Sequence, residues 1–293
     1  MYWKQLQDQA ALATGNFAKL FGNIEIPPLP QMAVQLLEMS RQEDIEIADI
    51  TRAISNDAGL AAKILKTVNS AQFCLPTKVT DIHHGVALLG VKRIQSLALG
   101  YSTAGVLPKQ APGFNHTVFW QDSIQRAVFA RTIVSRISPG MEGESFTGAL
   151  LQNMAIPILL STWGQYYQPV MAQSLQSKVS LVEIENQEFS WNHAQAGAWM
   201  ARNWGFPDML VCCIGLHHAT LDEVESLQLA GSPVIPVVLS AQLPYCREVL
   251  SKNYHLSDEN IRKAYAETDT ACNELAQLFD VPPPLALADQ LDV

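Results

Sequence analysis

The sequence predicts an all-helical protein. Apolar residues recur three and four positions apart along most of the chain, and no segment shows the convincing alternation of apolar and polar residues that is typical of a half-buried strand. Helix-start and helix-stop residues bound the apolar runs, as with Asp57 before one run and Gly90 between two others. With 293 residues, 48% of them hydrophobic, the chain can bury a substantial core.

The first half of the chain is predicted to be a series of short helices. A stiff proline-rich segment, residues 27–30, follows an amphipathic N-terminal helix over residues 1–22. Asp57 is placed to cap a helix, and Gly90 separates two more. The apolar spacing predicts helices over residues 32–39, 47–54, 57–68, 82–89 and from 91 onwards, with a turn at 69–76 and a loop at 107–115.

The second half repeats this pattern. A break is expected near Pro157, and Ser257 is placed to cap a short helix. The predicted helices cover residues 120–137, 146–160, 193–203 and 208–218, with others that begin at 232–233, at 257 and near 272–279.

Composition and charge exclude several classes of protein. The formal net charge of -9 argues against broad attraction to nucleic acid, which needs clustered Lys and Arg. No apolar run approaches the roughly 18 residues of a membrane span, and residues 1–22 lack the apolar core of a secretory signal. The five cysteines are scattered, so we expect reduced thiols, no disulfides and a cytoplasmic protein; they are Cys74, Cys212, Cys213, Cys246 and Cys272.

Two motifs could carry chemistry but have simpler interpretations. On one helix Cys213 and His217 would face the same direction, which suits two metal ligands. A closed zinc site needs about four ligands, so a packed helix with histidines at its end is favoured. Two helices that meet at Gly90, the second starting with Lys92 and Arg93, resemble a DNA-binding motif, but that second helix is too apolar to enter a groove.

The third motif is a pair of amides, Gln152 and Asn153, within an apolar predicted helix. Burying each amide costs about 1–3 kcal/mol unless it finds a hydrogen-bonding partner. From the residues alone, we expect both amides to pair with the backbone or with another polar side chain.

Three segments together resemble the opening of HDOD domains. They are IPPLPQMAVQLLEM, ISNDAGLAAKILKTVNSAQF and DIHHGVALLGVKRIQSLALG. The resemblance rests on a helix led by an Asp, an Asn-Ser pair followed by an aromatic residue, and a Leu-Leu-Gly junction; the matching residues are Asn56, Asp57, Asn69, Ser70, Phe73, Leu88, Leu89 and Gly90. Later segments match the remainder, although Ala58 stands where the family usually has proline. The resemblance implies a multi-helical HD-like fold in two helical halves.

HDOD domains are similar to HD phosphohydrolases, in which histidines and a His-Asp pair hold divalent metal. In this sequence the resemblance places Asp122 at the first His position, Gln152 and Asn153 at the His-Asp pair, and Gln242 near the late Asp position. Neutral amides are poor ligands for a divalent cation. The resemblance therefore implies a degenerate metal site with no bound metal, no cofactor and no catalytic residues.

The predicted organisation is an N-terminal helix over 1–22, an HDOD domain over 23–220 and a C-terminal helical extension over 221–293. The domain divides into halves at 23–110 and 111–220. Between them we expect a cleft lined by the six residues at HD-like positions: Asp122, Gln152, Asn153, His193, His217 and His218.

The resemblance implies a bacterial signal-transduction module. We expect it to bind a protein partner or a small ligand, such as one related to nucleotides, and to bind neither nucleic acid nor membrane. The alternative is a metal-dependent phosphohydrolase that uses Asp122, His193 and His217 as a reorganised ligand set.

Overall fold

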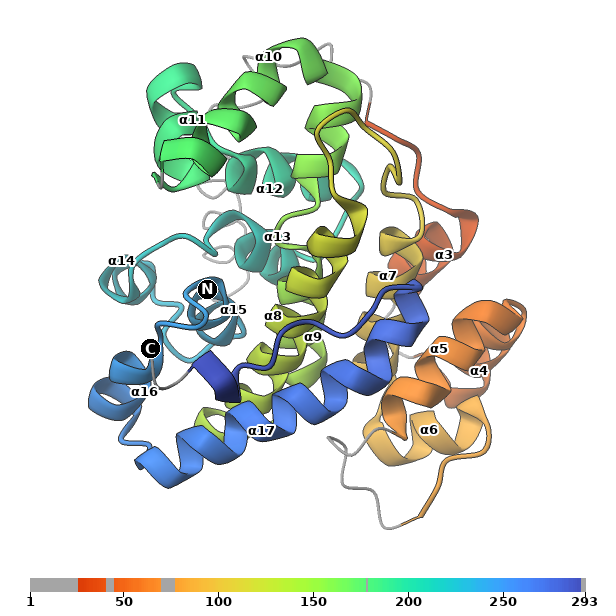
Figure 1. Cartoon of the computed structure of the whole chain (residues 1–293). Helices are drawn as coiled ribbons and strands as arrows, with labels where there is room; N and C mark the ends of the chain where they lie inside the picture. The colour runs from red at the N-terminus through yellow and green to blue at the C-terminus, as the bar shows by residue number, and fades with distance from the viewer. Residues whose placement is uncertain (1–25, 41–44, 70–76, 178, 291–293) are drawn as a thin grey trace.

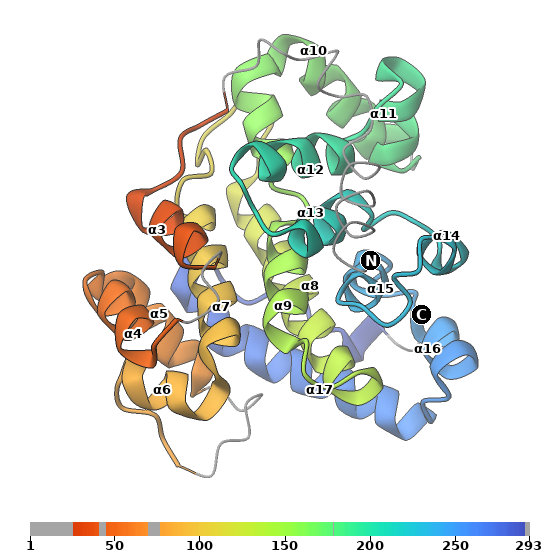
Figure 2. The ribbon, with the colours of Figure 1, turned by 180° about the vertical axis from the view of Figure 1, so that it is seen from behind.

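The protein is described here from a computed structural model, which covers residues 26–40, 45–69, 77–177 and 179–290. This part of the chain consists of helices and loops and contains no β-strand, so the all-helical prediction is confirmed. Figure 1, and Figure 2 from behind, show helices arranged around two central ones, α8 (His116–Ile137) and α9 (Glu142–Leu151). The predictions for residues 1–22, Ser70, Phe73 and Cys74 lie outside the described residues.

The first half of the chain folds as its apolar spacing predicts. Asp57 accepts a hydrogen bond from the backbone N–H of Leu60 at 2.9 Å, so it caps its helix even with Ala58 in the next position. Gly90, at φ +86°, joins two helices with a backbone conformation that favours glycine. The helices of this half are α3 (Gln31–Ser40), α4 (Ile47–Ser55), α5 (Ala58–Val68), α6 (Ile82–Leu89) and α7 (Val91–Ala104).

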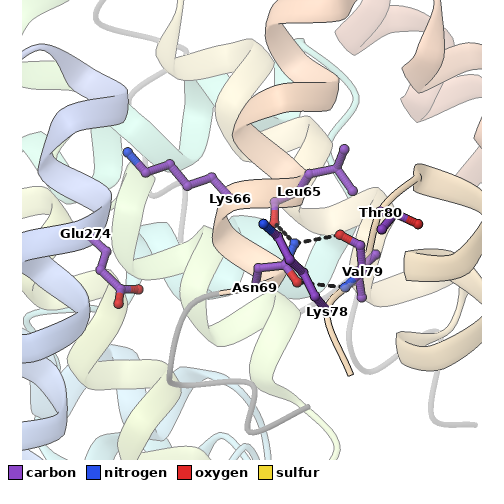
Figure 3. A pocket seen from close by; sticks show the side chains of 7 residues that line it. All are labelled: Leu65, Lys66, Asn69, Lys78, Val79, Thr80 and Glu274. Atoms are coloured by element: carbon purple, nitrogen blue, oxygen red, sulfur yellow. Dashed lines mark hydrogen bonds between the residues drawn. The ribbon is translucent and has the colours of Figure 1, made fainter. Parts of the chain in front are cut away.

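Asn69, at the end of α5, ties that helix to the segment that leads into α6 (Figure 3). Its side-chain Nδ2 donates to the carbonyl oxygens of Leu65, at 2.9 Å, and Val79, at 2.8 Å. Its Oδ1 accepts from the backbone N–H of Val79 at 2.7 Å. Only a side chain with both a donor and an acceptor at this reach can satisfy both backbone groups of Val79.

Replacing Asn69 with alanine is expected to lower the free energy of unfolding by about 1–3 kcal/mol, because the buried backbone groups of Val79 lose their partners. Urea unfolding measures this change. Asn203→Ala is the control: among the described residues this exposed side chain donates to the Trp199 carbonyl on its own helix, so its loss should change stability by less than about 0.5 kcal/mol. Equal effects of the two substitutions would contradict the role of Asn69.

The helix after Gly90 belongs to the core, as its composition predicts. Ile94, Leu97 and Ala98 are buried in α7, and the side chain of Arg93 is paired with Glu142 at 2.9 Å. A helix whose apolar side chains are buried against its neighbours has too little free surface to enter a DNA groove.

In the second half, the break between two helices lies at a different position from the one predicted from the sequence. The predicted break near Pro157 is wrong: α9 ends at Leu151 and α10 begins at Ala155, so Gln152 and Asn153 lie in the turn between two helices rather than inside one. Pro157 fits in the first turn of α10, where a missing N–H costs little. The other helices here are α10 (Ala155–Ser177), α11 (Leu181–Phe189), α12 (His193–Asn203) and α13 (Asp208–Gly215).

Residues after 220 continue the helical fold and pack on α8. Ser257 is the predicted cap, but the helix it begins is one long helix rather than a short one, because no helix breaker interrupts residues 258–275. The elements are α14 (Leu221–Ser226), α15 (Val234–Ala241), α16 (Arg247–Tyr254), α17 (Asp258–Leu275) and the 3₁₀ turns η2 (Ala276–Phe279) and η3 (Ala288–Gln290). Both α15 and α17 contact α8, and α17 crosses the lower part of Figure 1.

The described cysteines Cys212, Cys213, Cys246 and Cys272 are buried free thiols. Among the described helices, none is both long and apolar enough to cross a bilayer.

Candidate functional site

Three of the predicted site residues, His193, His217 and His218, form a cluster. One ring nitrogen of each lies within 4.8 Å of those of the others, and the Nε2 atoms of His193 and His218 are 3.1 Å apart. His193 and His217 are 3% and 1% exposed, whereas His218 reaches the surface. We call these three residues the histidine cluster.

Two helix ends bring the cluster together. Asn192 caps α12 by accepting from the Gln195 N–H at 3.1 Å, which makes His193 the first residue of that helix. The predicted helix over 208–218 is wrong at its end, because α13 stops at Gly215 and the two later histidines lie in the turn that follows. Cys213 and His217 therefore do not share a helical face, so the two-ligand arrangement that the sequence permits but does not favour does not form.

The ring of His217 is fixed by the backbone. Its Nδ1 lies 2.7 Å from the carbonyl oxygen of Ile214, which can only accept, so Nδ1 carries the proton. The opposite nitrogen, Nε2, is buried and has no hydrogen-bonding partner among the described residues. Burial, and then the neighbouring His218 and His193, lower the pKa of His217 well below its ordinary value, so the ring is neutral near pH 7.

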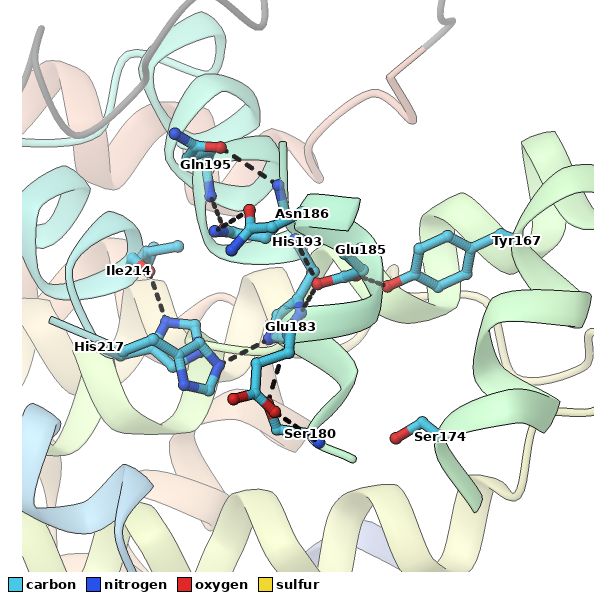
Figure 4. Close-up of polar contacts among 12 residues, drawn as sticks. Tyr167, Ser174, Ser180, Glu183, Glu185, Asn186, His193, Gln195, Ile214 and His217 are labelled. Atoms are coloured by element: carbon cyan, nitrogen blue, oxygen red, sulfur yellow. Dashed lines mark hydrogen bonds and ion pairs between the residues drawn. The ribbon is translucent and has the colours of Figure 1, made fainter. Parts of the chain in front are cut away.

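The ring of His193 is held by residues that the sequence did not indicate (Figure 4). Its Nδ1 lies 2.7 Å from Oε2 of Glu185 on α11, a carboxylate that is completely buried. Glu185 also accepts from the phenol of Tyr167 on α10. Sequence reasoning missed both residues because nothing in the polar run that contains Glu185 distinguishes a buried glutamate from an exposed one.

A second group joins Asp122, Arg126 and Asn153. The Asp122 Oδ2 accepts from Nε of Arg126 at 2.7 Å and, more weakly, from Nδ2 of Asn153 at 3.5 Å. Nη1 of Arg126 donates to the Ser240 carbonyl at 2.9 Å, so the end of α15, next to Gln242, also reaches the site. Arg126, a third functional residue that the sequence did not indicate, carries the only permanent charge in this group besides Asp122.

Arg126 links the two groups electrostatically. Partial burial, and then the neighbouring His193 and Arg126, lower the pKa of His218 below its ordinary value. The same guanidinium also lowers the pKa of His217. Both rings are therefore neutral beside a fixed positive charge.

The side chain of Gln152 takes no part in the hydrogen bonds described above for the histidines, Asp122 and Arg126. Its side chain is 1% exposed, and neither its amide nitrogen nor its oxygen has a hydrogen-bonding partner within the described part of the chain. The expectation that both amides find partners therefore holds for Asn153 and not for Gln152. Of the six residues expected to line the cleft, Gln152, His193 and His217 are buried, whereas His218 and Asp122 reach the surface.

The residues present fit a single transition-metal ion and not the full metal site of HD phosphohydrolases. The orphaned Nε2 of His217 and the adjacent nitrogens of His193 and His218 form a set of three imidazoles, which suits zinc, iron or nickel. The resemblance places the neutral amides of Gln152 and Asn153 at the positions of the His-Asp pair, and Asp122 is already paired with Arg126.

The comparisons identify the class to which this fold and site belong. The HDOD domain family matches residues 26–220, about two thirds of the chain. The chain belongs to the HDOD family.

Solved structures share this fold. An HDOD domain protein of unknown function from Geobacter sulfurreducens aligns with a TM-score of 0.68 and 18% identity, over 94% of this chain and 98% of that one. A Shewanella amazonensis protein, provisionally named a phosphohydrolase, aligns with a TM-score of 0.61 and 19% identity, over 98% and 93%. A Marinobacter aquaeolei protein, provisionally named a signal transduction protein, aligns with a TM-score of 0.65 and 19% identity, over 96% and 67%.

A curated protein is similar to this chain at the level of sequence. An uncharacterized protein of Treponema pallidum is 24% identical over 197 residues, which are 66% of this chain and 38% of that protein. The match thus spans less than half of the length of this relative.

Proposed function

We propose that the chain is a non-catalytic signalling module that recognises a protein partner or a small ligand through the histidine cluster and Arg126. The observation that carries this proposal is the ion pair between Arg126 and Asp122. By the family resemblance Asp122 lies at the first metal-ligand position of the HD enzymes, and the pair gives it the guanidinium of Arg126 as its partner. A divalent ion at that position would have to break the pair and would be repelled by the guanidinium.

Nucleotides are the first small ligands to test at this site. Guanidinium and imidazole groups are good donors to phosphate oxygens, and Arg126 and His218 lie together where the cluster reaches the surface. A cytoplasmic location, and recognition without nucleic acid or membrane, are part of this proposal.

A non-catalytic role is tested by measuring whether the purified protein hydrolyses phosphate esters. The purified protein is expected to show no hydrolysis of p-nitrophenyl phosphate or bis(p-nitrophenyl) phosphate above the metal-only background with Mn²⁺, Fe²⁺ or Zn²⁺. His193→Ala serves as the matched variant, since it removes one ring of the cluster. Metal-dependent turnover that disappears in His193→Ala would overturn the proposal.

Ligand binding tests the other half of the proposal. ATP and GTP affinity, measured by calorimetry, is expected to fall about tenfold in Arg126→Ala, because a charge-assisted hydrogen bond is lost. Arg247→Ala is the control, since Arg247 pairs with Asp258 on the surface away from the cluster. Equal affinity of the two variants would show that the nucleotide does not bind beside Arg126.

A second candidate function is a metal-dependent phosphohydrolase with a reorganised site. The observation that favours it is the set of three imidazole nitrogens within 4.8 Å of one another. The ligands would be His193, His217 and His218 rather than a set with Asp122, which Arg126 occupies. A bound transition metal would lower the pKa of a coordinated water. Metal analysis of the purified protein separates the candidates: stoichiometric Mn, Fe or Zn that is absent from His193→Ala, together with turnover, favours this one.

A further inference from the structure

Glu185 is a carboxylate buried among groups that all donate hydrogen bonds to it. It is 0% exposed and lies on α11, while its partners come from α10 and α12. Oε2 lies 3.1 Å from the backbone N–H and 2.7 Å from the ring Nδ1 of His193, and the phenol of Tyr167 donates to Oε1. In the part of the chain that the structure describes, its ion-pair contact is with this histidine ring.

The direction of these hydrogen bonds fixes the proton on His193. Burial, and then the adjacent carboxylate, raise the pKa of Tyr167 well above its ordinary value, so the phenol keeps its proton and donates. The backbone N–H can only donate, which leaves Oε2 as an acceptor for the ring Nδ1–H. In the neutral ring, Nε2 then carries a lone pair that faces Nε2 of His218 at 3.1 Å.

The tautomer of His217 is fixed in the same way, by an acceptor behind its Nδ1 atom. There the Ile214 carbonyl accepts from Nδ1–H at 2.7 Å, and the lone pair on Nε2 faces inward without a partner among the described residues. Two neighbouring rings are thus oriented by acceptors behind them so that each presents an unprotonated nitrogen to the same small volume.

The capping of α12 explains only part of the role of Glu185, whose Oε2 accepts from the backbone N–H of His193 at 3.1 Å. Asn192 and Gln195 already form a reciprocal capping box at the start of that helix, with hydrogen bonds of 3.1 Å in each direction. A buried carboxylate is costly to desolvate, and an apolar residue of the same size fills space without that cost. The feature that needs a carboxylate at this position is the ring of His193.

We propose that Glu185, oriented by Tyr167, is a positioning residue that holds His193 in the Nδ1–H tautomer and so keeps its Nε2 lone pair available to the ligand of the site. The role of Glu185 in fixing the tautomer does not depend on the proposed function. The statement that a ligand contacts Nε2 of His193 does rest on it. The arrangement matches the general pattern in which a carboxylate behind a histidine fixes its tautomer and orientation.

Imidazole ¹⁵N spectra of the full chain test the tautomer directly, with His193 assigned by difference from His193→Gln. The wild-type protein is expected to show His193 protonated at Nδ1 and unprotonated at Nε2. Glu185→Leu removes the acceptor and is expected to move protonation to Nε2. Glu185→Gln is expected to restore the wild-type pattern, because a carboxamide oxygen can still accept from Nδ1–H.

A matched buried tyrosine separates positioning from loss of stability. Tyr265, which is also buried, hydrogen-bonds Cys246 and the Pro244 carbonyl away from the cluster. Tyr265→Phe is expected to lower stability without altering the His193 signals, whereas Tyr167→Phe is expected to broaden or shift them. If Glu185→Leu does not fold, the Glu185→Gln and Tyr167→Phe spectra decide the question. Unchanged His193 signals in Tyr167→Phe and in a folded Glu185→Leu would overturn the inference.

Affinity for Zn²⁺ alone, measured with a competing chelator, provides a second readout. Glu185→Leu is expected to bind Zn²⁺ about 10–100-fold more weakly than the wild-type protein, with Glu185→Gln in between and Tyr265→Phe unchanged. A wild-type protein that does not bind Zn²⁺ would remove the second candidate function. The ¹⁵N spectra would still decide whether Glu185 positions His193, so the two failures are distinguishable.

Discussion

Lowering the pH from 7 to 5 is expected to reduce the free energy of unfolding by about 2 kcal/mol through His217 alone. The pKa of this buried ring in the folded protein lies well below its ordinary value, mainly because of burial and then because of His218 and His193. The unfolded chain binds a proton at the ordinary pKa near 6.5, so it holds more protons than the folded state below that pH. The stabilisation is therefore present above about pH 6.5 and is lost as the pH falls.

Urea unfolding at pH 7 and pH 5 measures this dependence. In His217→Gln the titrating ring is absent, so the loss of stability between the two pH values should be smaller by about 2 kcal/mol than in the wild-type protein. His255→Gln is the control, because this histidine lies between α16 and α17, outside the cluster. A pH dependence that is the same in His217→Gln and the wild-type protein would mean that His217 is charged in the folded state.

Gly148→Ala is expected to destabilise the protein by about 1–3 kcal/mol, because the new methyl group overpacks the contact between α9 and α13. A Cβ at Gly148 would lie 2.7 Å from the Cβ of Cys213, a distance that real Cβ atoms do not show. The neighbouring atom belongs to the stem of its side chain, so a rotation cannot relieve the contact and α13 has to move. The histidines after α13 would move with it.

Gly85→Ala is the matched control for this substitution. Gly85 is also helical, but a Cβ there would meet its nearest neighbour, Val79 Cγ1, at 3.4 Å, which is ordinary contact. Since alanine favours helix over glycine, this variant should gain about 0.5–1 kcal/mol. Thermal or urea unfolding of both variants gives the comparison; two changes of the same sign would contradict the close approach of α9 and α13.

The parts of the fold that depend on local chemistry could be predicted from the sequence. Asp57 caps α5 and Gly90 separates α6 from α7, because a cap and a left-handed turn depend on the residue at that position and on its immediate neighbours. The turn at Gln152 and Asn153 could not be placed in this way. The apolar pattern runs through it without interruption because the helices on both sides are buried.

Some residues of the candidate site could be predicted before the structure was known, and others could not. The family resemblance gave His193, His217 and His218 as site residues, and the structure brings these three together. It did not give Glu185, because a glutamate on a helix is usually solvated and here the packing of neighbouring helices buries it. It did not give Arg126 either, although Asp122 and Arg126 are four residues apart on α8 and can pair within that helix.

The sequence by itself determined the helical class and the order of the helices, since both follow from residue types and their spacing. Tertiary structure alone decided which nitrogen of His193 faces its neighbours and which charge lies beside the cluster. The physical reason is that a ring's tautomer depends on the group behind it, and Glu185 and Tyr167 reach that position only when α10, α11 and α12 pack together.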